Sequence, residues 1–385
     1  MVRKTLALLP FLPTSLAATL LASHFEGTLY TLSLSDDASE LTLASQVSAG
    51  GMPSWLTLDS AGATLYATDE SWLGGTKLSA WSVGEGGELT AAGEVSTDGG
   101  ELHSCLFGGE DGESFIAAAQ YNAGGMITYQ LPLTQSSTPL DAFHYSMSSP
   151  GPVPDRQDQP HPHSTFTDPT SAFLLSADLG ADLIRIFAIS PSGSLTECPP
   201  AAASPGSGPR HGAFWVDDGD AATTVLYVVN ELGNSVTSWD VSYGDDDCLT
   251  LTENKIVSTY PEGTDPPPGS KAAEIRIRDN FVYASNRFDK TFGQTSDSIA
   301  LFEVTGPGEF SFVELADSGA NFPRTFDINA AGDLVAVGGQ TSSDVVILER
   351  NTTSGRLGPV LAKLQIGQLG SEQQEDGLSA VIWSE

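Results

Sequence analysis

Residues 283–302 read YASNRFDKTFGQTSDSIALF, and this stretch contains the central part of a unit whose repetition along the chain predicts the fold. The segment Tyr283-Ala-Ser-Asn286 has the small residues of a strand end, a polar loop follows, and Ser298-Ile-Ala-Leu-Phe302 then alternates. Apolar and polar residues that alternate with period two, bounded by turn residues, are typical of β-strands. The stretch therefore predicts two neighbouring strands joined by a polar loop.

The same pattern occurs seven times along the chain. Its strand ends are Leu-Ala-Ser-His24, Tyr-Ala-Thr-Asp69, Ala-Ala-Ala-Gln120, Leu-Ser-Ala-Asp178, Tyr-Val-Val-Asn230, Tyr-Ala-Ser-Asn286 and Ala-Val-Gly-Gly339. Seven units of about fifty residues, each long enough for four strands, predict an all-β, seven-bladed β-propeller with four-stranded blades. A helical solenoid does not fit, because no segment keeps a 3.6-residue apolar period and the chain has 40 glycines and 23 prolines.

The first unit lacks an inner strand before His24, whereas the C-terminus has a spare one at 378–383 (LSAVIW). We expect this strand to complete the first blade, so that the N- and C-terminal strands pair and close the ring. Residues 19–385 are then one propeller domain.

Residues 1–18 are expected to form a signal peptide. Arg3 and Lys4 precede an apolar run over 5–16, and Ser15-Leu16-Ala17 offers small residues for cleavage. A sequon at Asn351 agrees with export. The sequence thus predicts a secreted protein, with a cytoplasmic location as the alternative.

The composition is strongly acidic, with 49 Asp and Glu against 16 Lys and Arg and a net charge of −33. Such a surface repels nucleic acids and anionic membranes, so we expect neither as a partner. Because basic residues are scarce, an arginine at a predicted site is informative.

Metal and cofactor motifs are not evident. His161 and His163 are two residues apart, but no third metal ligand is marked, and phosphate-loop, dinucleotide and Gly-X-Ser-X-Gly motifs are absent in context. We therefore expect no metal and no cofactor. The three cysteines lack metal-ligand spacing, and the sequence leaves open whether Cys198 and Cys248 form a disulfide.

Polar residues gather at one end of the predicted channel. In each blade the first two strands form a hairpin, so the residues that precede strand one and follow strand two meet at the same mouth. These positions include His103, His161, His163, Arg210, His211, Glu274 and Arg324 before strand one, and Glu70, Tyr121, Glu231, Arg287 and Gln340 after strand two. The opposite ends carry only turn residues, at Asp59, Asp168, Asp217 and Asn329. The mouth is therefore the predicted site.

Several strings at this mouth resemble one family. They are His161-Pro-His163, Asp178-Leu-Gly-Ala-Asp182, Gly208-Pro-Arg210-His211, Asn230-Glu231-Leu, Ala273-Glu274-Ile, Tyr283-Ala-Ser-Asn286-Arg287, Pro323-Arg324-Thr-Phe326 and Gly339-Gln340. Together they resemble the seven-bladed lactonase family, which includes 6-phosphogluconolactonase and fungal carboxy-cis,cis-muconate cyclase. Each string is weak alone, but their order over about residues 19–384 is specific.

The resemblance implies catalytic roles for His163, Arg210, Glu231 and Arg287. The arginines would anchor a carboxylate or an oxyanion, and the nearby arginines would lower the pKa of Glu231. Five further mouth residues are predicted to bind substrate: His161, His211, Glu274, Arg324 and Gln340. Structural alternatives stay open: the arginines would pair with Glu231 or Glu274 to join blades, and His163 would bond to a neighbouring blade's backbone.

Two hypotheses about function follow. The first is a cofactor-free enzyme that opens or forms a lactone ring, as a hydrolase or as a cycloisomerase, on a small carboxylate-bearing substrate. The second is a non-catalytic secreted propeller that binds a sugar acid or a protein partner at the same mouth. Neither the direction of the reaction nor the oligomeric state follows from the sequence.

Overall fold

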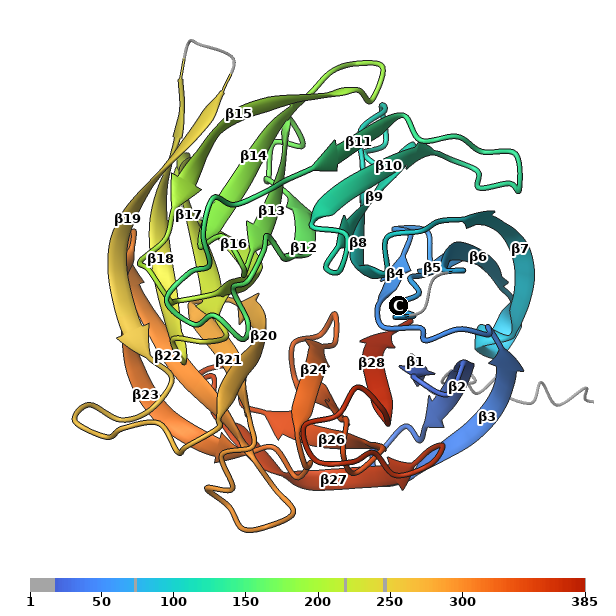
Figure 1. Ribbon diagram of the computed structural model, residues 1–385. Coiled ribbons are helices and arrows are strands. Elements are labelled where there is room, and N and C mark those ends of the chain that lie inside the picture. Colours follow the sequence, from blue (N-terminus) through green and yellow to red (C-terminus); the bar gives the residue numbers. More distant parts are fainter. Residues whose placement is uncertain (1–17, 73–74, 218–219, 245–247, 385) are drawn as a thin grey trace, which may run out of the picture.

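The computed structural model describes residues 18–72, 75–217, 220–244 and 248–384. Seven four-stranded antiparallel sheets stand around a central axis like the blades of a propeller (Figure 1). The predicted fold class is therefore confirmed. The expected signal peptide lies outside the described residues, except for Ala18, with which the first strand begins.

Each blade contributes one strand to each of four concentric positions (Figure 1). The innermost strands are β4 (Leu56–Leu58), β8 (Glu101–Phe107), β12 (Pro162–Thr167), β16 (Pro209–Asp217), β20 (Lys271–Arg278), β24 (Pro323–Ile328) and β28 (Leu378–Trp383). The second strands are β1 (Ala18–His24), β5 (Thr64–Ala67), β9 (Phe115–Gln120), β13 (Phe173–Asp178), β17 (Asp220–Asn230), β21 (Phe281–Arg287) and β25 (Leu334–Gly339). The third strands are β2 (Thr28–Leu34), β6 (Lys77–Val83), β10 (Gly125–Gln130), β14 (Leu183–Ile189), β18 (Ser235–Tyr243), β22 (Ser298–Gly306) and β26 (Asp344–Arg350). The outermost strands are β3 (Leu41–Ser48), β7 (Leu89–Ser96), β11 (Asp141–His144), β15 (Leu195–Ala202), β19 (Leu249–Ser258), β23 (Glu309–Asp317) and β27 (Leu357–Gln365), and a short 3-10 turn, η1 (Glu85–Gly87), precedes β7.

The ring closes through the two ends of the domain. The strand β28 pairs with β1 in antiparallel register, from Leu20 opposite Trp383 to His24 opposite Leu378. The hydroxyl groups of Ser23 and Ser379 add a buried hydrogen bond of 2.8 Å across this seam. The predicted closure of the first blade is thus confirmed, and it supplies the innermost strand that completes the four-stranded sheet of this blade.

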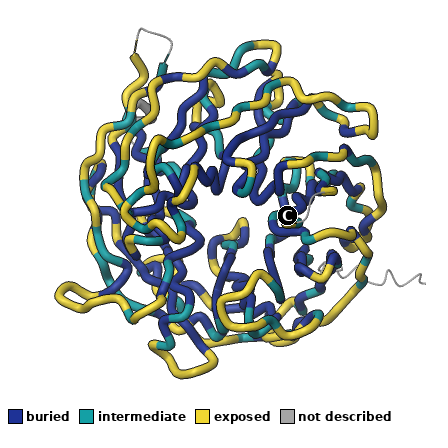
Figure 2. Tube along the Cα trace, viewed as in Figure 1, coloured by how far each residue is buried: buried dark blue, intermediate teal, exposed yellow. Residues whose placement is uncertain are grey.

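The core lies between the faces of neighbouring blades, where the period-two patterns place their apolar residues. The second strand β13 is almost wholly buried, whereas the outermost strand β19 alternates with exposed residues (Figure 2). Cys198 on β15 and Cys248, which directly precedes β19, form a disulfide with a Cα–Cα distance of 5.8 Å. This bond ties two adjacent blades at the rim and answers the question that the sequence left open.

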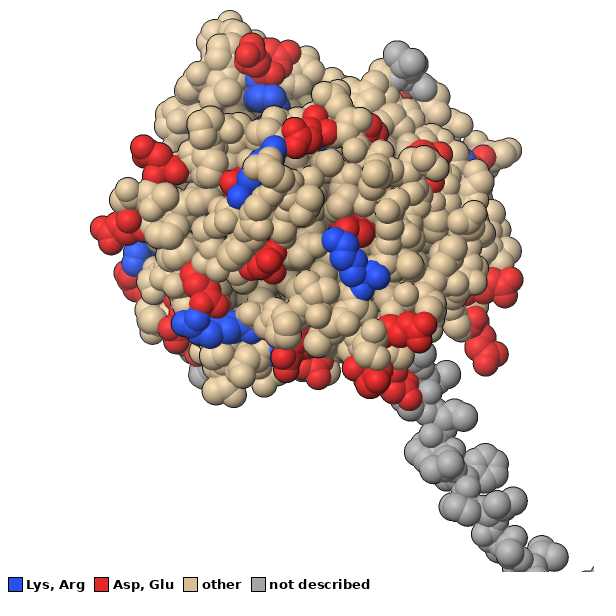
Figure 3. All heavy atoms as spheres, turned by 90° about the horizontal axis from the view of Figure 1, so that it is seen from below, with Lys and Arg blue, Asp and Glu red and all other residues tan. Residues whose placement is uncertain are grey.

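The acidic residues do not form one dense patch on the face drawn in Figure 3. Carboxylates are scattered there, and several of the few lysines and arginines lie beside them (Figure 3). In the described ranges, no helix is long and apolar enough to span a bilayer. Charged side chains are also buried at one end of the channel, where Arg210 and Glu231 are almost fully covered.

Candidate active site

The inner strands carry β-bulges where they begin at the mouth. In six of them the pairing register shifts near the mouth. The extra residues are Leu102 in β8, His163 in β12, Arg210 in β16, Ala273 and Glu274 in β20, Arg324 in β24 and Ser379 in β28. A bulge changes the direction of the side chain of its extra residue. The same irregularity in several inner strands therefore directs side chains from several blades toward the axis.

A cavity of about 220 Å³ opens at this mouth. Its lining residues are Glu70, Trp72, Leu102, Tyr121, Arg156, His163, Glu231, Lys271, Arg287, Phe322, Arg324, Gln373 and Glu375. Of the mouth residues named from the sequence, six line this cavity: Glu70, Tyr121, His163, Glu231, Arg287 and Arg324. Arg210 and His211 line a smaller hollow beside it, which also contacts His163 and Arg324.

Glu231 is the centre of the buried charges. Its Oε2 lies 3.0 Å from Arg210 Nε and 2.8 Å from Arg287 Nη2, and its Oε1 lies 2.7 Å from Arg156 Nη2. Burial alone would raise the pKa of this carboxyl, but Arg156, Arg287 and Arg210 outweigh it and hold the pKa well below its usual range. The direction predicted from the sequence agrees with this. Glu231 is therefore a permanent carboxylate that orients three guanidinium groups, and both predicted arginines do pair with it.

His163 is buried but unsatisfied. Its ring packs edge-on against Tyr121 and His211, with centroids 5.7 and 5.1 Å away, and its Nδ1 has no hydrogen-bond partner among the described residues. Burial, and then the nearby Arg210, hold the pKa of His163 well below its ordinary value. The alternative of a bond to a neighbouring blade's backbone finds no support in the described contacts. His163 thus contributes a neutral imidazole to the cavity wall, with a buried nitrogen that lacks a partner and can accept a proton.

The ring of His211 closes the channel beside His163. Arg210 Nη1 lies 3.3 Å from His211 Nε2, and His211 Nδ1 lies 3.1 Å from Glu274 Oε1. Because a guanidinium only donates and a carboxylate only accepts, Nε2 accepts and Nδ1–H donates. Glu274 also holds Arg276 Nη1 at 2.5 Å, and it does not pair with Arg324. These contacts make Glu274 an anchor for His211 behind the cavity.

His161 and Gln340 lie behind the cavity wall. The two ring nitrogens of His161 lie 2.9 Å from Tyr121 O and 3.0 Å from Asp158 Oδ1, and the ring stacks on Tyr121. Gln340 Nε2 donates to Gln374 O at 2.6 Å and so holds the loop before β28. Both residues, predicted to bind substrate, position parts of the wall.

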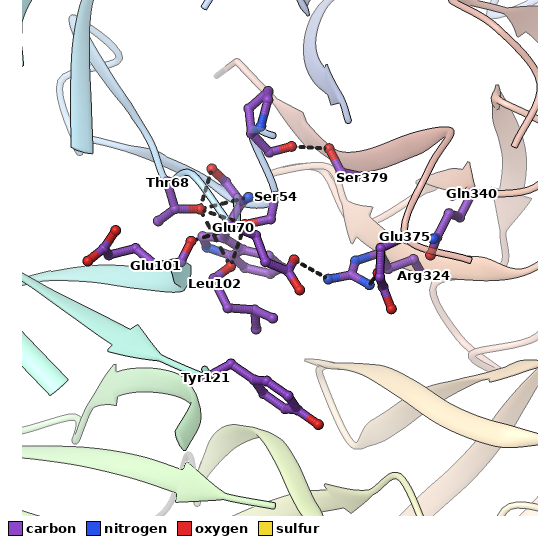
Figure 4. Close-up of polar contacts among 12 residues, drawn as sticks. Ser54, Thr68, Glu70, Glu101, Leu102, Tyr121, Arg324, Gln340, Glu375 and Ser379 are labelled. Atoms are coloured by element: carbon purple, nitrogen blue, oxygen red, sulfur yellow. Dashed lines mark hydrogen bonds and ion pairs between the residues drawn. The ribbon is translucent and has the colours of Figure 1, made fainter. Parts of the chain in front are cut away.

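Arg324 joins two carboxyl groups on the opposite wall (Figure 4). Its Nη2 lies 3.1 Å from Glu70 Oε2 and its Nη1 lies 2.9 Å from Glu375 Oε2. Burial raises the pKa of Glu70 to about 8, although Arg324 acts against this shift. At neutral pH the cavity therefore contains one carboxyl group that keeps its proton, Glu70, and one that does not, Glu231.

Sequence reasoning missed three charged groups that line the cavity. Arg156 lies in the segment between β11 and β12, which is longer than the corresponding segments of the other blades. Lys271 lies three residues before the quoted Glu274, and Glu375 lies in the loop before β28. The proline before His163, Arg210 and Arg324 was the available signal for the bulges, since proline fits the first residue of a strand or a bulge.

Among the described residues, no group of three or more His, Cys, Asp and Glu side chains is placed to hold a metal ion.

The family model "Lactonase, 7-bladed beta-propeller" matches residues 16–371. The chain belongs to this lactonase family. A curated relative from Arthroderma benhamiae, named "Probable 6-phosphogluconolactonase", is 32% identical over 80% of this chain and 76% of its own length. The 6-phosphogluconolactonase of Bacillus subtilis is 28% identical over 80% of this chain and 82% of its own.

Two solved structures share the fold of the chain. The periplasmic gluconolactonase of Pseudomonas aeruginosa superposes with a TM-score of 0.76 and 21% identity, over 92% of this chain and 98% of its own. A protein from Lactobacillus plantarum superposes with a TM-score of 0.78 and 23% identity, over 96% and 99%. At this identity the likeness shows the seven-bladed architecture.

Proposed function

We propose that this lactonase-family protein hydrolyses the ring of a small anionic lactone in the mouth cavity. The observation that carries the proposal is that a buried neutral imidazole with a free nitrogen, His163, lines the same cavity as Arg287, whose Nε has no partner among the described residues. A neutral imidazole suits proton abstraction from water, and a fixed cation suits an oxyanion. The relatives named 6-phosphogluconolactonase favour hydrolysis as the direction.

The steps balance with groups of this chain. His163 Nδ1 takes a proton from water while the water oxygen bonds to the lactone carbonyl carbon, and the carbonyl electron pair moves to its oxygen beside Arg287. The carbonyl then re-forms as the ring C–O bond breaks, and the leaving oxygen takes a proton from Glu70, whose raised pKa keeps it protonated at neutral pH. The product is a hydroxy acid, and Glu70 regains its proton from solvent as His163 releases one.

Glu231, Arg210 and Arg156 act through position. Glu231 is too acidic to donate a proton at neutral pH, and its three contacts fix the guanidinium planes around the cavity. A ring-forming reaction of the muconate cyclase kind would use the same cavity with other steps: a carboxylate oxygen of the substrate would bond to one carbon of a C=C bond, and the other carbon would take a proton. No cofactor is needed in either direction.

Turnover by the purified protein tests this function. The panel contains sugar lactones, 6-phosphogluconolactone, muconolactones and carboxymuconate, with wild type beside His163→Ala. We expect one lactone to be opened, and kcat to fall by about 100- to 10,000-fold in His163→Ala. His144→Ala, on the exposed part of β11, is the matched control and keeps full activity.

A non-catalytic propeller would give another pattern. It would turn over no member of the panel, and His163→Ala would change only its affinity for a sugar acid. Folded wild type with no turnover therefore contradicts the enzyme proposal.

We infer in addition that the chain is exported. The basic and apolar residues before Ala18, the disulfide between Cys198 and Cys248 and the sequon at Asn351 support export, because disulfides persist in oxidising compartments. N-terminal sequencing of the protein from culture medium tests this, and a start near residue 18 is expected. An uncleaved protein found in the cytoplasm would contradict it.

A further inference from the structure

Lys271 occupies a position that is costly for a cation. It begins β20 directly opposite Arg287 at the end of β21, so the two side chains leave the sheet on the same side. Like charges directly opposite in a sheet destabilise it. Yet Lys271 is half-buried, lines the cavity and makes no ion pair with any residue that the structure describes.

The neighbouring carboxylates are already engaged. The charged groups around Lys271 are Arg287, Glu231, Arg156 and Glu375. Glu231 binds three arginines and Glu375 binds Arg324 through Oε2, and neither carboxylate makes an ion pair with the lysine. Burial, and then Arg287, lower the pKa of Lys271, which shows that its charge is disfavoured where it stands. The protein thus keeps a cation at a cost to stability that no described contact repays.

Lys271 is less deeply buried than His163 and Arg287, the residues proposed to act on the lactone ring. His163 and Arg287 are each 4% exposed, whereas Lys271 is half-buried and the side chain of Arg156 is 28% exposed. Lys271 and Arg156 therefore mark the outer part of the cavity. This protein has 16 lysines and arginines in all, and four of them, Arg156, Lys271, Arg287 and Arg324, line one cavity.

We propose that Lys271, flanked by Arg156, binds a second anionic group of the substrate, a phosphate ester or a carboxylate outside the lactone ring. The ring itself then sits deeper, at His163 and Arg287. The assignment of the ring rests on the proposed function, whereas the anion subsite rests on the unpaired charge of Lys271. The structure thus assigns Lys271 a role in substrate specificity.

Kinetics of Lys271→Met on matched lactones test the proposal. The substrates are gluconolactone, which is neutral, 6-phosphogluconolactone and a glucarolactone, which adds a carboxylate. Loss of a charge-assisted contact should raise KM for a charged lactone by about 10- to 100-fold. We expect kcat, and KM for gluconolactone, to stay unchanged, and the lactone that is affected tells phosphate from carboxylate. An equal change for gluconolactone, or no change for either charged lactone, overturns the proposal.

Binding and stability provide readouts that do not depend on turnover. Wild type should bind inorganic phosphate or malonate in calorimetry at least tenfold more tightly than Lys271→Met, and equal binding overturns the proposal even if no lactone is opened. If wild type opens no lactone but this difference is found, the proposed function fails and the anion subsite stands.

The melting temperature separates a binding role from a structural one. Lys271→Met should raise it by about 1–2 °C, because the repulsion from Arg287 is removed. Lys77→Met, which breaks the pair with Glu94 at the start of β6, is the matched control and should change neither KM nor anion binding. A lower melting temperature for Lys271→Met would show a structural lysine and overturn the proposal.

Discussion

Two buried arginines at opposite ends of the propeller, Arg287 and Arg350, differ in how far the N–H groups of their guanidinium find hydrogen-bond partners. Arg350, at the far end, donates from Nε to Tyr283 OH at 2.6 Å, from Nη1 to Gly332 O at 2.6 Å, and from Nη2 to Asp279 at 2.9 Å. Arg287, at the mouth, binds Glu231 and Ala272 O through Nη2 but leaves its buried Nε without a partner in the described part of the chain.

This difference in hydrogen-bond partners distinguishes a charged group that stabilises the fold from one that is available to a ligand. A buried polar atom without a partner costs stability, so native proteins satisfy nearly all of them. Asn329, at the far end, follows this rule, since its Oδ1 accepts from the amides of Asp333 and Leu334. At the mouth His163 Nδ1 and Arg287 Nε depart from it, and both residues line one cavity with Lys271, which makes no ion pair with any described residue. We attribute the departure to substrate.

Removal of the central carboxylate should have the largest effect on stability. Glu231→Gln keeps the shape but leaves Arg156, Arg210 and Arg287 without a counter-charge. We expect the free energy of unfolding to fall by about 3–5 kcal/mol, as measured by chemical denaturation. Glu94→Gln, from an exposed pair, should change it by about 0.5 kcal/mol or less. Equal effects of the two changes would refute the central role of Glu231.

The two arginines provide the sharpest contrast. Arg287→Ala should lower kcat/KM for the lactone by about 100- to 1000-fold, and its melting temperature should change little because Glu231 keeps two partners. Arg350→Met should lower the free energy of unfolding by about 2–4 kcal/mol, since several buried acceptors lose their donor, and the folded variant should keep its kcat/KM. Steady-state kinetics and denaturation of both variants measure this. The comparison breaks down if Arg350→Met loses activity while folded or if Arg287→Ala keeps it.

Acid should weaken the mouth through its imidazoles. Burial, the largest cause in each, holds the pKa values of His103, His163 and His211 well below the ordinary value. Because the folded state keeps these rings neutral and the unfolded state protonates them near pH 6.5, their stabilisation is complete above that pH and is lost as the pH falls. Each ring contributes up to about 1.4 kcal/mol per pH unit.

The dependence of the melting temperature on pH between 8 and 5 measures this contribution. The curve should fall below pH 6.5 and should fall less steeply in His103→Gln, which removes one of the three rings. His144→Gln, exposed on β11, is the control and should follow the wild-type curve. Parallel curves for wild type and His103→Gln would contradict the assignment of neutral, buried rings.

The smallest expected effect lies at the far end. Asn329→Ala removes the acceptor of two turn amides and should lower the free energy of unfolding by about 1 kcal/mol. Kinetic constants should stay at wild-type values, since this turn is remote from the cavity. A change in KM here would show that the two ends are coupled.

The sequence was sufficient for the fold because each blade repeats a local signal. Period-two runs predicted the strands, and the spare strand at 378–383 predicted the ring closure that β28 and β1 make. The end of the channel that holds the site also followed, since hairpin geometry alone places residues such as His163 and Arg287 together.

Details of the cavity wall did not follow, for two physical reasons. Bulges separate neighbours in sequence, so that His163 faces the cavity while His161, two residues earlier, holds Tyr121. Irregular loops have no register from which to place a side chain, and one of them supplies Arg156. Lys271 could not be singled out from the sequence, because the property that marks it is the absence of an ion-pair partner, which only the structure shows.

A crystal structure with 6-phosphogluconate bound would test the central claim most directly. The claim is that the atoms left without partners at the mouth are those that meet the substrate. It predicts a carboxylate oxygen within hydrogen-bond distance of both Arg287 Nε and His163 Nδ1, with the phosphate against Lys271. A ligand bound in the cavity with both nitrogens still unpartnered, or bound away from the mouth, would contradict it.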